Sequence, residues 1–102
     1  MEKLLGTGLV KRIGVANFNQ SQLEDILENA EVKPAVNQLE CHPFLNQNQM
    51  LAFCRNAGIQ LVAYSPLGSP NRLWAPSHDK KGTTVLTHSV IADIAACHGK
   101  SR

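Results

Sequence analysis

The chain has 102 residues, of which 43% are apolar and 18% charged, a composition typical of a folded globular domain rather than of a disordered segment. Ten lysines and arginines against eight aspartates and glutamates leave a small positive charge, and these residues are too scattered to indicate nucleic-acid binding. No apolar run approaches the ~18 residues that span a bilayer, which excludes a membrane-spanning helix.

The cysteines point to a reducing compartment. Cys41, Cys54 and Cys97 are odd in number, widely spaced, without a CxxC pair and without a secretory signal peptide before them. We therefore expect free thiols and a cytoplasmic location. At this length the chain forms one domain at most.

Three short apolar runs have the length of strands rather than helices. They cover residues 13–16, 35–39 and 59–64, and none alternates cleanly between apolar and polar residues. Such runs are typical of strands covered on both faces, as in parallel α/β sheets. A helical turn at residues 1–5 is expected before the first strand.

Helix signals fill the gap between the first two runs. Ser21 and Glu24 form a capping-box pattern, which predicts that a helix begins there. Leu23, Ile26 and Leu27 follow at helical spacing and give that helix an apolar side.

A second helix is expected between Asn46, as its N-cap, and Gly58, just past its end. Its buried side would consist of Met50, Leu51, Phe53 and Cys54. A polar loop follows the third strand, and a last helix through residues 90–95 ends at Gly99. The order predicts an α/β fold with parallel strands, either a barrel or a doubly wound sheet.

Polar side chains gather where the predicted strands end, which is where parallel α/β folds bind ligands. The carboxamides of Asn17 and Gln38 can bond the carboxamide of a nicotinamide, and the ring of Tyr64 can stack on it. The loop from Ser65 to Ser69 offers hydroxyls and amides to a pyrophosphate. Taken alone, an asparagine after a strand is more often a helix cap than a ligand-binding residue.

The amino-acid sequences of three segments are specific: GVANFN at residues 14–19, VNQLECHP at 36–43 and AYSPLGSP at 63–70. In order and spacing they resemble three segments of the aldo-keto reductases, of the aldose and aldehyde reductase kind, and the resemblance covers nearly the whole chain. It implies a (β/α)8 TIM barrel that reduces aldehydes and ketones with NADPH. Residues 1–102 are similar to strands five to seven of that barrel with their helices, in its C-terminal half, and so to an incomplete barrel.

Carried over residue by residue, the resemblance assigns Asn17 and Gln38 to the nicotinamide carboxamide and Tyr64 to the ring. It assigns the pyrophosphate path to Ser65, Leu67 and Ser69. It assigns one wall of the substrate pocket to Trp74. The family usually has serine where this chain has Ala16, so one hydrogen bond to the carboxamide is missing.

The family's catalytic Asp, Tyr, Lys and His belong to the first half of the barrel, and its 2′-phosphate site follows the eighth strand. Neither matches a segment of this chain, so we expect no catalytic residue in it. Tyr64 matches the stacking residue and not the proton donor. His42 lies beside Cys41, yet neighbours in extended chain point to opposite sides, which favours a structural role over a metal or nucleophile pair.

Three hypotheses follow. The chain is part of an NADPH-dependent carbonyl reductase; or it is a truncated, non-catalytic product that binds nucleotide or another protein; or it is a nonfunctional fragment. Three strands of an eight-stranded barrel leave two unpaired edges, so aggregation or self-association of the chain is expected. NADPH titration and a cooperative melt would distinguish the three.

Overall fold

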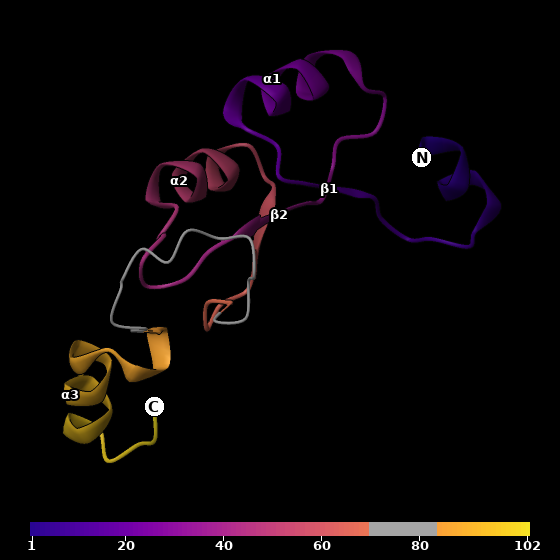
Figure 1. The fold of residues 1–102 in the computed structure, drawn as a ribbon. Helices are drawn as coiled ribbons and strands as arrows, with labels where there is room; N and C mark the ends of the chain where they lie inside the picture. The colour runs from indigo at the N-terminus through magenta and orange to yellow at the C-terminus, as the bar shows by residue number, and fades with distance from the viewer. Residues whose placement is uncertain (70–83) are drawn as a thin grey trace.

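A three-stranded parallel sheet forms the centre of the computed structural model, which describes residues 1–69 and 84–102 (Figure 1). The elements in chain order are η1 (Glu2–Thr7), β1 (Gly14–Ala16), α1 (Gln20–Asn29), β2 (Val36–Glu40), α2 (Asn48–Asn56), β3 (Gln60–Tyr64), η2 (Val85–Thr87) and α3 (Ser89–Cys97). The three expected strands and the α/β class are confirmed. The short η elements are 3-10 helices, and η1 extends the helical turn expected at the N-terminus.

The strands lie in the order β1-β2-β3, so β2 is central. Ala16 pairs with Gln38, and Gln38 pairs with Val62, which places these three residues in one row across the sheet. Side chains alternate between the two faces of a strand. Asn37 and Leu61 therefore point to the opposite face, which the helices cover.

The core lies between that covered face and the helices α1 and α2. Leu23 of α1, Cys54 of α2 and Ile59 before β3 form a buried cluster, and Leu23 and Cys54 are completely buried. Each such side chain contributes about 1.5–3 kcal/mol through removal of apolar surface from water. Partly buried residues complete the cluster: Val15, Phe18, Leu27, Met50, Phe53, Ala57 and Leu61.

The start of α1 differs from the expectation by two residues. Asn19, not Ser21, is the N-cap: its Oδ1 accepts from the Gln22 amide at 2.9 Å, and the Gln22 Oε1 accepts from the Asn19 amide at 3.0 Å. This box satisfies two amides at the point where the chain leaves β1. The pattern at Ser21 and Glu24 therefore falls inside the helix. Leu23 is buried and Ile26 and Leu27 are half-buried, as expected.

The start of α2 lies one residue later than expected. Gln47 is the N-cap, in a left-handed conformation with φ 53° and no side-chain cap bond. Asn46 stands one residue before it, and its Oδ1 accepts weakly from the Asn48 amide at 3.4 Å. Gly58 follows the helix with φ 72°, as expected of a left-handed C-terminal glycine. Leu51, expected on the buried side, is 39% exposed.

The last helix is confirmed, but it stands apart from the sheet (Figure 1). His88 is its N-cap, with Nδ1 accepting from the Val90 amide at 3.3 Å. Apolar Val90 and Ile94 are 52% and 53% exposed, and α3 has no buried residue. Gly99 ends it in the left-handed conformation. Most of the predicted polar loop before it falls at residues 70–83, outside the described residues.

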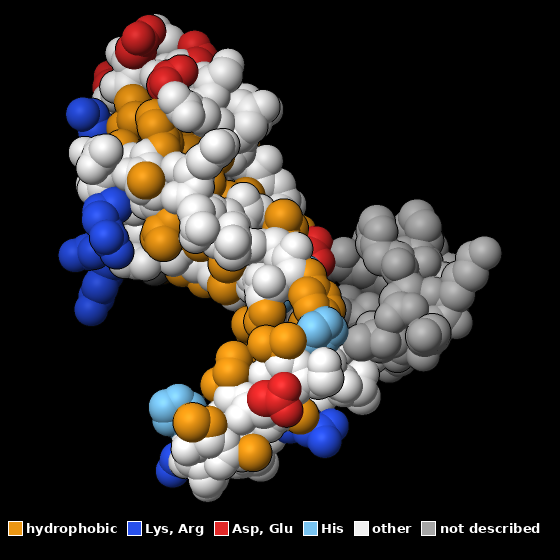
Figure 2. Space-filling view, turned by 90° about the vertical axis from the view of Figure 1, so that its left-hand side faces the viewer, with side chains coloured by type: hydrophobic (Ala, Val, Ile, Leu, Met, Phe, Trp, Pro, Cys, Tyr) orange, Lys and Arg blue, Asp and Glu red, His pale blue; other side chains and the backbone are white. Residues whose placement is uncertain are grey.

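The whole chain is open rather than compact. Its accessible surface is 7890 Å², against roughly 5,700 Å² for a compact protein of this mass. Its radius of gyration is 17.6 Å, where about 13 Å is typical of a compact chain of ~100 residues. Figure 2 shows apolar side chains along the hollowed side of the molecule. One face of the sheet is therefore available for contact with other groups. No helix in the described part of the chain is long and apolar enough to cross a membrane.

The close approach of β1 to β2 depends on Gly14. A Cβ at this position would lie 2.9 Å from the Val36 carbonyl oxygen and 3.1 Å from the Val36 Cβ. We expect Gly14→Ala to destabilise the fold by about 1–3 kcal/mol, because two backbones would have to separate. Chemical denaturation followed by circular dichroism measures this. Gly6→Ala is the matched control, since nothing lies within 4 Å of its Cβ; equal effects of the two substitutions would contradict the packing argument.

Candidate functional site

Asn17 lies directly after β1 in a left-handed conformation, with φ 59°. Its backbone amide donates to the Gln38 carbonyl at 2.9 Å, so the parallel pairing continues one residue beyond the strand before the chain turns. The side chain is exposed. Asparagine tolerates this conformation better than most residues, which explains why the turn can occur without glycine.

Gln38 and Tyr64 lie on the open face of the sheet. Gln38 is exposed in the row of Ala16 and Val62, and Tyr64 is half-buried at the end of β3, opposite Glu40. Both belong to the alternate set of residues that points away from α1 and α2. The structure thus places Gln38 in the middle of β2 and Tyr64 at the end of β3 on one face of the sheet, with the turn of Asn17 beside Gln38.

The segment after β3 is a closed turn. Ser65 has φ 50°, its carbonyl accepts from the Gly68 amide at 2.8 Å, and its Oγ accepts from the Ser69 Oγ at 2.8 Å. Gly68 has φ 76°, and a Cβ there would lie 3.2 Å from the Cγ2 of buried Val85. Leu67, at the tip, is 58% exposed. The turn therefore presents an ordered backbone with two hydroxyls at the same edge as Asn17.

Asn37 is a residue that the sequence interpretation missed. It is completely buried, and its side chain bonds both main-chain groups of Phe18: Nδ2 donates to the Phe18 carbonyl at 3.0 Å, and Oδ1 accepts from the Phe18 amide at 3.4 Å. It also makes a side-chain hydrogen bond with Cys54. The available signal was an asparagine at a strand position that alternation assigns to the core, where a polar group requires partners.

The ring of His42 bonds groups that are close to it in the chain. Its Nδ1 accepts from the Phe44 amide at 3.2 Å, and its Nε2 lies 3.3 Å from Glu40 Oε1. The Cys41 Sγ turns to the Asn46 carbonyl instead, at 3.7 Å. Residues 1–69 and 84–102 contain no group of His, Cys, Asp and Glu that could hold a metal ion.

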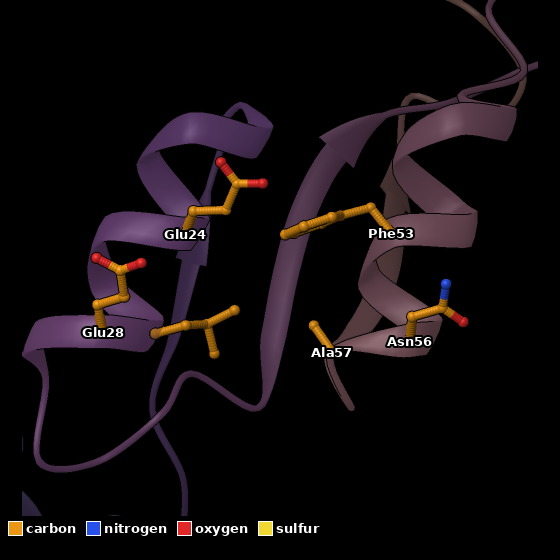
Figure 3. Close-up of a pocket in the computed structure, with 6 residues that line it drawn as sticks. Glu24, Glu28, Phe53, Asn56 and Ala57 are labelled. Atoms are coloured by element: carbon orange, nitrogen blue, oxygen red, sulfur yellow. The ribbon is translucent and has the colours of Figure 1, made fainter.

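Two open hollows lie away from this edge. One, of about 340 Å³, runs between α1 and α2, with Glu24, Glu28 and Phe53 on its walls (Figure 3). The other, of about 390 Å³, lies beside β1 and the start of the chain, with Glu2, Ile13 and Val32 among its lining residues. None of the candidate residues lines either hollow.

Comparison with known proteins decides the family. The sequence model of the aldo/keto reductase family matches residues 1–95. The chain belongs to this family. It is similar to aldo-keto reductase family 1 member A1 of Xenopus tropicalis, with 48% identity over 101 residues, and to its human namesake, with 44% identity over 101 residues. The Gallus gallus namesake is 57% identical over 74 residues, 72% of this chain and 23% of that protein.

The Xenopus and human matches cover 99% of this chain but 30% of each relative. This aldo/keto reductase chain thus spans less than a third of the length of the curated relatives that it matches. The sequence resemblance to the family is confirmed. Of the residues that the resemblance assigned to a ligand, six lie in β2, at the end of β3 or in the turns after β1 and β3; the seventh, Trp74, lies outside the described residues.

The thiols of this aldo/keto reductase chain should differ in reactivity. Cys97 is exposed, Cys41 is half-buried and Cys54 is completely buried. Burial raises the pKa of the Cys54 thiol above its ordinary value of 9.0, and the hydrogen bond with Asn37 partly offsets this. We expect a disulfide reagent to modify Cys97 first and Cys54 last, because Cys54 must be exposed by opening before it reacts. Mass spectrometry of partially labelled chains gives the order.

The raised pKa of the Cys54 thiol also makes the free energy of unfolding depend on pH. A group that holds its proton more tightly in the folded state stabilises the fold fully below its unfolded pKa, and the contribution is lost as pH rises through the folded pKa. Thermal stability should therefore fall above about pH 9, and the fall should be smaller in Cys54→Ala. Cys97→Ala is the control and should keep the whole fall; the same fall in both variants would contradict the assignment.

Proposed function

We propose that the chain supplies the nicotinamide and pyrophosphate side of an NADPH site in an oxidoreductase that reduces aldehydes and ketones to alcohols. The observation that carries this proposal is the arrangement of Gln38 and Tyr64 on one face of two neighbouring strands, with Asn17 directly after β1 and bonded through its amide to the Gln38 carbonyl. Membership in the aldo/keto reductase family supports the reaction class. Residues 1–102 would correspond to three consecutive βα units, strands five to seven, of a (β/α)8 barrel.

The groups at this edge fit a nicotinamide. The carboxamides of Asn17 and Gln38 are exposed, and each offers both a donor and an acceptor, as does the carboxamide that they would hold. The half-buried ring of Tyr64 lies on the same open face as Gln38 and would fix one side of the nicotinamide ring. These three residues bind and orient. When bound, NADPH supplies the hydride that reduces the carbonyl carbon.

The closed turn after β3 fits the pyrophosphate. Its hydroxyls at Ser65 and Ser69 are already 2.8 Å apart, and the Gly68 amide has fixed the backbone. A turn that is ordered in advance loses little conformational freedom on binding. Leu67 would add an apolar contact from the tip. We propose Ser65, Leu67 and Ser69 as the pyrophosphate-binding residues, and Trp74 as a wall of the substrate pocket.

The test is a fluorescence titration of the 102-residue chain with NADPH. We expect saturable binding that Tyr64→Ala weakens by roughly two- to tenfold, because an aromatic stacking contact contributes roughly 0.5–1.5 kcal/mol. Tyr64→Phe keeps the ring and is the matched control, which should bind like the wild type. Absence of binding by the wild-type chain would contradict the proposal.

The same variants check that Tyr64 stacks and does not donate a proton. We expect no carbonyl reductase activity from the chain alone, because its sole tyrosine matches the stacking position of the family. Turnover by the wild type that Tyr64→Phe abolishes would overturn this role. Sedimentation at the titration concentrations gives the oligomeric state, since the open sheet face and the exposed apolar residues of α3 favour self-association.

Ala16 offers a gain-of-function test. It lies next to Gln38 across β1 and β2, on the open face, where the family usually has a serine hydroxyl. A neutral hydrogen bond contributes about 0.5–1.5 kcal/mol, so Ala16→Ser should tighten NADPH binding by roughly two- to tenfold. Val62→Ser, in the same row on the next strand, is the control and should not tighten binding. Unchanged affinity in Ala16→Ser would argue against a nicotinamide at this place.

A further inference from the structure

Asn37 is a polar residue in an apolar place. It is completely buried in the middle of β2, on the face that packs against α1 and α2, close to the cluster of Leu23, Cys54 and Ile59. An amide in such surroundings destabilises the fold unless all its strong hydrogen-bonding groups have partners. No buried side-chain polar atom of the described residues lacks a partner. The position therefore calls for an explanation in terms of what Asn37 holds.

What it holds is the main chain of Phe18. The Asn37 side chain donates to the Phe18 carbonyl and accepts from the Phe18 amide. It thus takes the place of the main-chain hydrogen-bond partners that a neighbouring strand would give Phe18 if β1 continued. The chain has left the sheet at this point, because Asn17 has turned into the left-handed region. Without Asn37, both main-chain groups of Phe18 would lose their partner inside a part-buried site.

Asn17 is consequently fixed from both sides. Before it, its own amide bonds the Gln38 carbonyl; after it, the Phe18 peptide is bonded by Asn37. Asn19 then caps α1. The residues that make the two anchors are neighbours on β2, and they point to opposite faces of the sheet: Gln38 toward the candidate site and Asn37 toward the core.

We propose that Asn37 is the positioning residue of the candidate site: it sets the left-handed conformation of Asn17 through Phe18, and thereby the direction in which the Asn17 carboxamide meets a nicotinamide. Asn37 itself does not touch the ligand. This inference rests on the function proposed above for Asn17.

The first measurement needs no ligand. In wild-type chain labelled with 15N, the Phe18 amide should exchange with solvent as slowly as the amides inside β2, and the three-bond coupling of Asn17 should report a positive φ. In Asn37→Leu, which keeps the volume and removes both bonds, we expect at least tenfold faster exchange at Phe18 and an averaged coupling at Asn17. Asn37→Ser is the second variant if leucine prevents folding, since its hydroxyl is too short to reach both groups.

The second measurement is the NADPH titration, with concentrations corrected for the folded fraction. We expect Asn37→Leu to raise the Kd by about tenfold, as for loss of one orienting hydrogen bond. Ile59→Ala is the matched control: Ile59 is 4% exposed in the same core, and its side chain makes no hydrogen bond. It should destabilise the chain while changing the Kd less than twofold.

The outcomes are separable. An unchanged Asn17 coupling in Asn37→Leu would overturn the positioning role whether or not NADPH binds. Equal loss of affinity in Asn37→Leu and Ile59→Ala would also overturn it, since the effect would then be one of stability alone. A wild-type chain that shows a slowly exchanging Phe18 amide but binds no NADPH would overturn the proposed function and the affinity part of the inference, and leave the conformational part supported.

Discussion

The in-register pairing of β2 with both of its neighbours is the constraint on which the other features depend. Ala16, Gln38 and Val62 form one row, and every side chain in that row faces away from the helices. A shift of one residue would turn Gln38 into the core and Asn37 out of it. The same register that exposes one carboxamide buries the next, so the polar edge and the apolar core are determined together.

Two non-glycine residues in the left-handed region stand where strands end: Asn17 after β1 and Ser65 after β3. Such conformations cost of order 1 kcal/mol each and persist where the surroundings hold them. The bonds that hold them differ in kind. Ser65 is held by its own turn, through Gly68 and Ser69, whereas Asn17 is held by groups of another strand. The turn at Ser65 is thus a local structure, whereas the turn at Asn17 depends on the pairing of β1 with β2.

Much of this was predictable from the sequence, for identifiable reasons. The strands were recognisable because short apolar runs between helix signals are typical of parallel sheets. The site residues stay a prediction, which rests on the ligand-binding end that parallel strands share and on the family resemblance. The N-cap of α1 was misplaced because two residue pairs, Asn19 with Gln22 and Ser21 with Glu24, both fit a capping-box pattern. The direction in which the chain leaves β1 decides that the first pair forms the box. Leu51 was misjudged because the burial of a side chain depends on which other elements pack against it, and periodicity within one helix does not contain that information.

Each of the three residues in the turn from Asn17 to Asn19 has a separate role. The turn offers Asn17 at the sheet edge, passes the Phe18 peptide to Asn37, and begins α1 at Asn19. A substitution that shifts the turn at Asn17 is therefore expected to act on the start of α1 as well. Ala16 and the turn after β3 cap no helix, so side chains there can change with less effect on α1.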